Sequence, residues 1–457
     1  MDFEFSVPVI VVGGGAAGAV AALSARLAGA EVLLVERDAS ARGTTAMSQG
    51  LMCAAGTRAQ AAAGIADDAD TLFADIMAKT RGLADPVIAR AVADGSGPTV
   101  DWLCDVLAYP FVLDSGARAA YGHSRQRLHG WLHHGGADMV QFLHAKLAEA
   151  GVDVLMPARL LELLGRDGQI DGIVVERPDG RSEAIGCGAL ILASGGFAAN
   201  HEQVAAHMPE AAAARHNGHE GNMGDGIWLG AQAGAALGDM GSYQGYAMLA
   251  DPHGITVPPG VLVEGGIIVN RHGQRFTNEV TDIAGMVHPV LAQPDGTAWV
   301  LLDGRIEGLN DYIPETRALR ESGAIRSADN AAALAAMIGA DPAVLAATLA
   351  DAHAAAGAGR ADGQGRDWAA VQPPAWPVLA IRVCGAIYHT QGGLQIDGSA
   401  RVLRRDGGRF ANLLACGGAA RGVSGPSWWG YLPAMGLGSA ITMGRIAGLS
   451  AAAITAG

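Results

Sequence analysis

Three glycines near the start of the chain have the spacing of a site that binds a dinucleotide. Gly13, Gly15 and Gly18 form the pattern Gly-x-Gly-x-x-Gly. The first glycine permits a tight turn, the second lets the backbone approach a pyrophosphate, and the third lets a helix pack closely on a strand. Glu36 follows 18 positions after Gly18. A carboxylate at that place accepts hydrogen bonds from a ribose diol and repels a phosphorylated ribose.

The segments around these residues predict the elements that position them. Residues 8–12 are a β-branched run typical of a buried parallel strand, and residues 16–28 have the Ala/Leu composition of a helix. A second predicted strand, residues 31–35, ends directly before Glu36. A strand, a glycine turn, a helix and a second strand in this order predict a helix N-terminus that offers N–H groups to a pyrophosphate. NAD and FAD both remain possible at this point.

Two later segments favour FAD. Residues 189–197 begin with a hydrophobic run, which is followed by the glycine pair Gly195-Gly196. Residues 413–418 are a second hydrophobic run that ends in the glycine pair Gly417-Gly418. A predicted helix start at residues 436–440 follows the second pair. Three remote parts of the chain therefore bring glycine-lined backbone to what we expect to be one elongated ligand, which suits FAD more than NAD.

With these segments the chain resembles the fumarate reductase and succinate dehydrogenase flavoprotein superfamily, in particular its 3-ketosteroid dehydrogenase and cyclohexanone dehydrogenase type. The landmarks are Gly13 to Glu36, Arg42 to Gly50, Ala193 to Phe197, Gly224 to Ile227, Gly273 to Glu279, His389 to Gly393, and Gly417-Gly418. The resemblance implies an α/β fold, with a Rossmann-like FAD-binding domain of the glutathione-reductase type interrupted by a smaller α+β cap, and the substrate held between the two. We expect the FAD-binding domain at 1–238, the cap at 239–384 and a return segment of the FAD-binding domain at 385–457.

The same resemblance assigns residues to the cofactor. The expected FAD-binding residues are Gly13, Gly15, Ala16, Ala17, Gly18, Glu36, Arg37, Thr44, Thr45, Ser48, Gln49, Gly50, Ala193, Ser194, Gly195, Asp225, His389, Gly417, Gly418, Gly438, Ser439 and Ala440. Some members bind FAD covalently through a histidine, and Thr44 stands at that place, so we expect non-covalent FAD. Gly418 replaces an acidic residue that often follows the C-terminal glycines.

Four positions separate this chain from the fumarate-reducing members, which hold a dicarboxylate with arginine and histidine. Ile283 stands where an arginine would protonate the substrate, and Met435 stands where an arginine would bind it. The two substrate histidines match Tyr246 and Tyr388. A buried dianion without cationic partners is unfavourable by several kcal/mol, so a neutral ketone fits better.

Tyrosines can carry the chemistry that a ketone desaturase needs. A phenol can hydrogen-bond a carbonyl oxygen, and a phenolate of lowered pKa can remove an α-proton while the β-hydride leaves for the flavin. The resemblance points to Tyr431 and Tyr246 as the acid/base and carbonyl-polarising pair, supported by Tyr388. Ordinary half-buried tyrosines are the alternative. Trp428 and Trp429 are candidates for shaping the substrate pocket, or are plain core residues.

A histidine-rich stretch lies in the first third of the chain. Four histidines fall between residues 121 and 136 without a carboxylate or cysteine at ligand spacing, which disfavours a metal site. The resemblance places the stretch near the active site, with His133 or His134 as the expected contact in the substrate pocket.

The overall composition excludes several classes of protein. The net charge of -14 disfavours a nucleic-acid partner. Five cysteines without a CxxC pair favour a reducing cytoplasm. The apolar stretches 7–25 and 436–457 contain glycines that suit a turn and a packed internal helix, so we expect no integral membrane segment.

The sequence thus predicts an FAD-dependent oxidoreductase that introduces an α,β double bond next to the carbonyl of a cyclic or small ketone. The alternatives are a reductase of an activated alkene, a di- or tricarboxylate dehydrogenase, and a flavin-binding protein without turnover. Because a second dinucleotide motif is absent from the sequence, we expect an external electron acceptor: a quinone, a carrier protein or oxygen.

Overall fold

The computed structural model describes residues 3–114, 119–282, 284–311 and 313–457. The chain divides into two compact units. The first comprises Met1–Met208, Gly218–Gln244 and His389–Gly457, and the second comprises Pro209–Asn217 and Gly245–Tyr388. The boundaries expected at 239 and 385 thus lie a few residues later. The expected division also missed Pro209–Asn217, which joins the second unit because β10 (Arg215–His216) pairs in parallel with β17 (Val378–Thr390).

The first unit is built on a sheet in which β19, β20, β9, β1, β2 and β6 are neighbours in that order, with the β7–β8 hairpin paired to β9. The strands are β1 Ser6–Val12, β2 Val32–Val35, β6 Asp153–Leu155, β7 Arg159–Arg166, β8 Gln169–Glu176, β9 Ser182–Leu192, β19 Arg401–Leu403 and β20 Arg409–Ala415. Val12 pairs with both Val35 and Leu192, and Leu192 pairs with Ala415. The carboxyl ends of four parallel strands therefore meet at one edge of the sheet.

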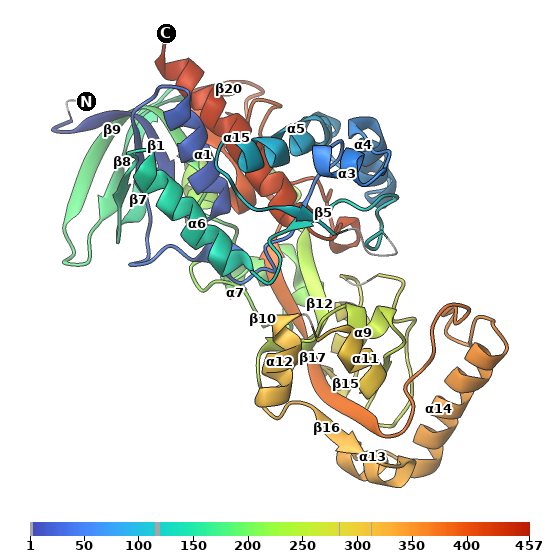
Figure 1. The fold of residues 1–457 in the computed structure, drawn as a ribbon. Helices are drawn as coiled ribbons and strands as arrows, with labels where there is room; N and C mark the ends of the chain where they lie inside the picture. The colour runs from blue at the N-terminus through green and yellow to red at the C-terminus, as the bar shows by residue number, and fades with distance from the viewer. Residues whose placement is uncertain (1–2, 115–118, 283, 312) are drawn as a thin grey trace. The chain divides into compact units, whose positions relative to one another are not determined.

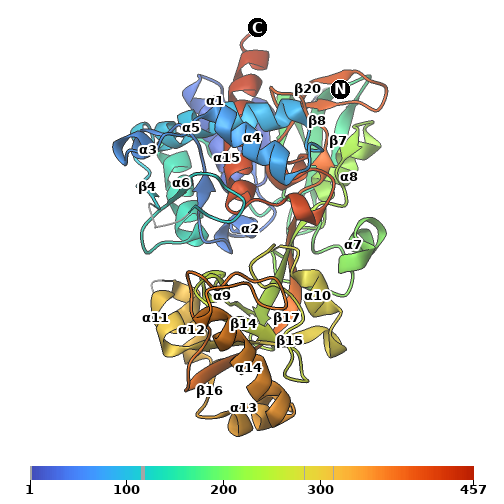
Figure 2. The same ribbon diagram turned by 90° about the vertical axis from the view of Figure 1, so that its right-hand side faces the viewer.

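Helices pack around this sheet (Figures 1 and 2). They are α1 Ala16–Leu27, α2 Gly43–Ala46, α3 Arg58–Ala62, α4 Ala69–Lys79, α5 Pro86–Asp105, α6 Gly136–Glu149, α7 His201–His207, α8 Asp225–Gln232 and α15 Met435–Thr455. Helix α15 packs closely along α1, because a Cβ at Gly444 would lie 2.4 Å from the Ala17 oxygen and one at Gly448 would lie 2.2 Å from the Ala21 oxygen. Small sheets of β3 Met52–Cys53, β4 Val112–Leu113 and β5 Leu128–Gly130, and of β11 Leu237–Gly238 and β18 Gly393–Leu394, complete the unit.

The second unit contains a mostly antiparallel sheet with the order β13-β12-β17-β15-β14, and β10 and β16 also pair with β17. Its strands besides β10 and β17 are β12 Tyr243–Ala250, β13 Ile255–Thr256, β14 Ile267–Val269, β15 Thr297–Asp303 and β16 Arg326–Ala328. Its helices are α9 Gly260–Val263, α10 Val287–Leu291, α11 Gly304–Leu309, α12 Pro314–Glu321, α13 Ala331–Ile338 and α14 Pro342–Gly357. Helices α13 and α14 bury one face, which includes Leu334, Leu345 and Leu349, against β14, β15 and β17.

A buried ionic cluster supports one end of this second unit. Arg275 donates from Nε to Glu279 at 2.7 Å and also forms an ion pair with Asp362. Arg366 approaches the other Glu279 oxygen at 3.2 Å and donates to the carbonyl oxygens of Gly266 and Leu262. The side chains of Glu279 and Arg366 are 0% and 1% exposed. Buried charges of this kind are tolerated because each has opposite charges and hydrogen bonds around it.

Among the described residues one helix, α15, is long and apolar enough to cross a membrane, and half of its apolar window is buried inside the protein. Helices α13 and α14 meet the same criterion only when they are taken together across a bend of 117°.

Candidate cofactor and active site

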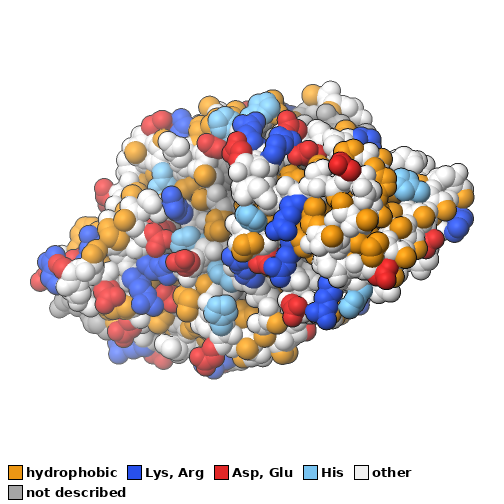
Figure 3. Space-filling model, turned by 90° about the horizontal axis from the view of Figure 1, so that it is seen from below, with side chains coloured by type: hydrophobic (Ala, Val, Ile, Leu, Met, Phe, Trp, Pro, Cys, Tyr) orange, Lys and Arg blue, Asp and Glu red, His pale blue; other side chains and the backbone are white. Residues whose placement is uncertain are grey.

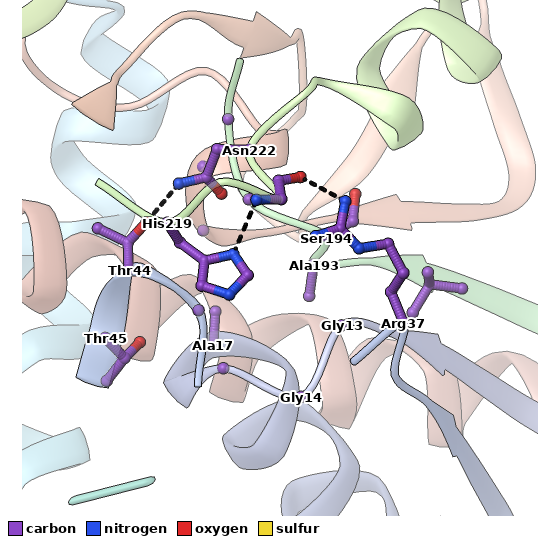
Figure 4. A pocket seen from close by; sticks show the side chains of 18 of the residues that line it. Gly13, Gly14, Ala17, Arg37, Thr44, Thr45, Ala193, Ser194, His219 and Asn222 are labelled. Atoms are coloured by element: carbon purple, nitrogen blue, oxygen red, sulfur yellow. Dashed lines mark hydrogen bonds between the residues drawn. The ribbon is translucent and has the colours of Figure 1, made fainter. Parts of the chain in front are cut away.

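A pocket lies at the sheet edge where the four parallel strands end, and all its lining residues belong to the first unit. Its floor comes from the turn after β1 and the first turn of α1. Its walls come from the residues after β2, β9 and β20, from α2, and from the segment that precedes α8. Figure 4 shows side chains of these segments pointing toward one another around the pocket.

The glycine turn of this pocket leaves no room for side chains. Gly13 has φ +113°, and a Cβ there would lie 2.4 Å from the Ala193 oxygen. A Cβ at Gly18 would lie 1.9 Å from the Gly13 oxygen. A Cβ at either position would force the backbone to shift. Only glycine therefore lets the main chains approach this closely at the turn and at the start of α1.

Polar side chains hold the start of α1 in place. The Thr45 hydroxyl accepts a hydrogen bond from the Ala16 N–H at 3.1 Å. Glu36 accepts from the Gly14 N–H at 2.6 Å through one carboxylate oxygen and from the Asp38 N–H at 2.9 Å through the other. Each carboxylate oxygen has a second lone pair. Glu36, which lines the pocket, therefore keeps the capacity to accept bonds from a ribose diol, the role expected from the sequence.

Most of the expected cofactor residues line this pocket. The residues that do are Gly13, Gly15, Ala16, Ala17, Glu36, Arg37, Thr44, Thr45, Ser48, Ala193, Ser194, Gly195, Asp225, His389, Gly417, Gly418 and Ala440. Gly18, Gln49, Gly50, Gly438 and Ser439 are not among the lining residues. Gly18 and Gly438 instead allow main-chain packing: a Cβ at Gly438 would lie 2.7 Å from the Cys53 oxygen.

Sequence reasoning missed several lining residues. Asp38, His219, Gly221 and Asn222 all line the pocket. The only sequence signal for the last three is their place just before the Gly224-Asp225-Gly226 landmark. Arg159 was also missed, and its Nε lies 3.2 Å from Asp225 Oδ2.

The residues present fit FAD. The cradle at Gly13 and Gly15 accepts a group only if no Cβ occupies it, and the start of α1 supplies the N–H groups and positive dipole end that a pyrophosphate needs. The Ser194 hydroxyl is buried beside the pocket without a hydrogen-bond partner among the described residues. Buried hydroxyls are normally satisfied, so a ligand that supplies the missing partner fits this place.

Tyr431 is the predicted catalytic tyrosine that belongs to the first unit. It follows a short 3-10 helix, Trp428–Gly430, and its ring meets the His389 ring edge-on with 6.1 Å between centroids. His389 lines the FAD pocket. Burial raises the pKa of the Tyr431 hydroxyl and lowers the pKa of His389. Both side chains are therefore neutral at physiological pH.

Tyr246 and Tyr388 both belong to the second unit, with 5.3 Å between their ring centroids. The Tyr246 hydroxyl donates to the Val257 oxygen at 2.6 Å, and the Tyr388 and Thr256 hydroxyls lie 2.6 Å apart. Burial raises the pKa of Tyr388 as it does for Tyr431. The expected phenolate of lowered pKa is therefore wrong for Tyr388 and Tyr431, because burial disfavours the charged form.

The expected pocket residues lie in the first unit but outside the described pocket lining. The Arg81 guanidinium lies over the Trp429 ring at 4.3 Å, and Trp428 is half-buried beside it. His133 and His134 are both exposed. His134 stacks on Trp131 with 3.9 Å between centroids and lies 3.3 Å from Asp138. Their roles toward substrate stay predictions.

The remainder of the histidine-rich stretch has structural partners. Arg127, 1% exposed, donates to both Asp67 oxygens at 2.7 and 2.8 Å and pairs with Asp75. His129 Nε2 lies 3.0 Å from the Thr57 hydroxyl. No group of three or more potential metal ligands occurs among the described residues.

Met435 and Ile283 are the two positions at which the resemblance predicts that an arginine of the fumarate-reducing members is missing. Met435 is buried at 2% exposure, and Ile283 lies outside the described residues. Within the second unit, Arg275 and Arg366 are bound to carboxylates, as are Arg215 and Arg382, which pair with Asp251. On the face drawn in Figure 3, acidic and basic side chains are intermixed.

Comparison with known proteins identifies the family. The profile of the FAD binding domain family matches residues 8–427. The chain is 31% identical over 448 residues to a fumarate reductase (cytochrome) of Shewanella frigidimarina, covering 98% of this chain and 77% of that protein. It is 27% identical to the NADH:fumarate oxidoreductase of Klebsiella pneumoniae, covering 92% of this chain and 45% of that protein.

Solved structures give the same result. The open conformation of a flavocytochrome c3 fumarate reductase superimposes with a TM-score of 0.85 at 27% identity, over 99% of this chain and 79% of that chain. A 3-ketosteroid-Δ4-(5α)-dehydrogenase from Rhodococcus jostii RHA1 superimposes with a TM-score of 0.77 at 26% identity, over 99% and 98% of the two chains. The chain therefore belongs to the FAD binding domain family, within the fumarate reductase and succinate dehydrogenase flavoprotein superfamily, and is an FAD-dependent oxidoreductase that acts on CH–CH groups.

Proposed function

We propose that this oxidoreductase is a dehydrogenase that introduces an α,β double bond next to the carbonyl of a cyclic or small neutral ketone. The observation that carries the proposal is the set of side chains at the positions where fumarate-reducing relatives bind a dicarboxylate. Met435, Tyr246 and Tyr388 stand there, and none of them carries a positive charge. A dianion buried among them lacks the ion pairs that offset its desolvation, whereas a ketone needs only a hydrogen-bond donor.

Tyr431 is the proposed donor. Its raised pKa keeps the phenol protonated, so the O–H can bind a carbonyl oxygen and stabilise the negative charge that grows there as the α-proton leaves. When bound, FAD supplies the acceptor for the β-hydride at N5. His389, between Tyr431 and the pocket, is neutral and adds no competing positive charge.

With Tyr431 as the donor, Tyr246 is the proposed base, with Tyr388 in support. For that role Tyr246 must first release to solvent the hydroxyl proton that it now donates to the Val257 oxygen, and the resulting phenolate then accepts the α-proton of the substrate. Two Phe variants test this: Tyr246→Phe and Tyr388→Phe are expected to keep FAD and lose reduction by ketone. Parent rates in both would remove these two tyrosines from the proposal.

We further propose that FAD is held non-covalently, because Thr44 has no nucleophilic imidazole, and that a quinone, a carrier protein or oxygen reoxidises it. The need for a small-molecule substrate and an external electron carrier agrees with the fumarate reductase relatives. Each of the five cysteines is free, which supports the proposed cytoplasmic location. Acid precipitation of the holoprotein is expected to release all FAD into the supernatant.

The direct test is anaerobic titration of the FAD-loaded protein with cyclic ketones, steroids and di- or tricarboxylates, followed by flavin absorbance. The proposal expects bleaching with at least one saturated ketone and none with succinate. Bleaching by carboxylates alone would overturn it.

A second candidate is reduction of an activated alkene or oxidation of a polycarboxylate. The observation that favours it is the 31% identity with a fumarate reductase over 98% of this chain. Dithionite-reduced protein mixed anaerobically with fumarate, acrylate or a cyclic enone distinguishes the candidates. Rapid reoxidation by fumarate selects the carboxylate activity, and reoxidation by the enone alone selects the neutral carbonyl substrate.

A further inference from the structure

A short segment of the first unit lies across the FAD pocket from the glycine turn. Residues 219–222 precede α8, and His219, Gly221 and Asn222 all line the pocket. They are hydrogen-bonded to Arg37 and Asp38, which follow β2, and to Thr44 in α2. Figure 4 shows Asn222 and His219 on one side of the pocket, with Thr44 and Arg37 reaching toward them.

Asn222 forms the more buried of these connections. Its side-chain amide donates to the Thr44 hydroxyl at 2.5 Å, and the residue is only 4% exposed. Its amide oxygen faces the backbone on the far side, since a Cβ at Gly195 would lie 2.3 Å from that oxygen. Asn222 therefore joins α2 to the turn after β9, two walls of the same pocket.

His219 and Gly221 make the second connection. The Gly221 N–H donates to His219 Nδ1 at 3.1 Å, so in the neutral ring the proton is on Nε2. That nitrogen lies 2.9 Å from Asp38 Oδ2 and donates to it. The Arg37 guanidinium donates to the Gly221 oxygen at 3.2 Å. A Cβ at Gly221 would lie 1.9 Å from Arg37 Nη2, so only glycine permits this approach.

We propose that His219, Gly221 and Asn222, together with Arg37, Asp38 and Thr44, form a clasp that closes over bound FAD and sets the rate at which FAD leaves. Both partners of each of these hydrogen bonds line the pocket, so the proposal requires that the bonds break before FAD leaves. At Thr44 the hydrogen bond from Asn222 ties one wall of the pocket to another. The inference needs FAD binding, but it does not depend on which substrate the enzyme oxidises.

The test measures FAD release from the holoprotein by the rise in flavin fluorescence in the presence of an excess of a competing apoflavoprotein. Thr44→Val and Asn222→Ala each remove one partner of the buried hydrogen bond. Each variant is expected to release FAD about tenfold faster, which corresponds to about 1.4 kcal/mol. Because both substitutions break the same bond, the double variant is expected to release FAD at the rate of the single variants.

Two further variants distinguish loss of this hydrogen bond from a general effect of substituting a threonine or an asparagine. Thr44→Ser keeps the hydroxyl and is expected to release FAD at least about fivefold more slowly than Thr44→Val. Asn330→Ala removes the N-terminal cap of α13 in the second unit and serves as the matched Asn→Ala control, with parent release. Single variants within about twofold of the parent, or a double variant near one hundredfold, would overturn the clasp.

Discussion

The pocket of the first unit and the buried ionic cluster of the second unit use their polar groups in different ways. The pocket is lined by glycine, alanine and hydroxyl side chains together with charged side chains such as Arg37 and Asp38, and its carboxylate Glu36 orients the backbone of the phosphate turn. In the second unit, Arg275, Glu279 and Arg366 bind one another in the interior. The comparison teaches that the arginines of this buried cluster stabilise the fold of the second unit. Ligand binding in the first unit depends instead on glycines, whose missing side chains leave room for the ligand.

The largest expected effect comes from breaking the charge cluster of the second unit. Glu279→Ala leaves two buried guanidinium groups without their shared carboxylate and is expected to lower the free energy of unfolding by about 3–5 kcal/mol. Urea unfolding followed by tryptophan fluorescence measures the loss, with exposed Glu321→Gln as the control. An unchanged unfolding midpoint in Glu279→Ala would mean that the cluster does not support the unit.

The next effect concerns the one predicted catalytic phenol of the first unit. Tyr431→Phe is expected to keep FAD and to slow anaerobic flavin reduction by ketone about 100-fold, the usual effect of losing one donor to a developing oxyanion. Because burial raises the Tyr431 pKa, the parent rate should not show a rise with pH between 7 and 9.5 that Tyr431→Phe abolishes. Such a rise would identify Tyr431 as a phenolate base instead of a neutral donor.

A smaller effect tests whether FAD binding in the first unit requires glycine at the positions where main chains approach each other. Gly18→Ala introduces a Cβ 1.9 Å from the Gly13 oxygen, and overpacking of this kind costs about 1–3 kcal/mol. FAD affinity, measured by quenching of flavin fluorescence, is expected to fall about tenfold to one hundredfold. Gly308→Ala in α11, where a Cβ meets nothing within 4 Å, is the control and should bind FAD as the parent does.

The smallest effect follows from His389. Its pKa is lowered in the folded protein by burial, so the unfolded chain takes up the proton first and stability falls as the pH drops below about 6.5. Replacing it in His389→Asn is expected to remove about 0.7 kcal/mol of the stability loss between pH 7.5 and 6. Exposed His201→Asn should leave that loss unchanged in urea unfolding at the two pH values.

The sequence predicted the first unit better than the second for a physical reason. The turn at Gly13, the helix that follows it and the strand before Glu36 are local features, and glycine spacing reports directly where backbones approach. The hydrophobic run at 189–197 and the packed helix at 436–457 were predicted in the same way, and the structure has β9, which ends at Leu192, and α15, Met435–Thr455, at those places.

Other features depend on tertiary contacts that no spacing encodes. Residues 209–217 join the second unit through the pairing of β10 with β17, which comprises two residue pairs, and His219 and Asn222 line the pocket because the loop before α8 lies against it. The pKa directions of Tyr388 and Tyr431 are set by burial, which the tyrosine positions alone do not reveal.

The close packing of α15 on α1 has a consequence for biosynthesis. Strand β1 and α1 leave the ribosome well before α15, yet Gly436, Leu437 and Ala440 at the start of α15 line the same pocket as Gly13. The nascent chain cannot complete its flavin site until more than four hundred residues after Gly13 have been translated. We therefore expect the growing polypeptide to keep the surface of α1 that α15 later covers exposed until α15 has been made, and to acquire its yellow colour only after that.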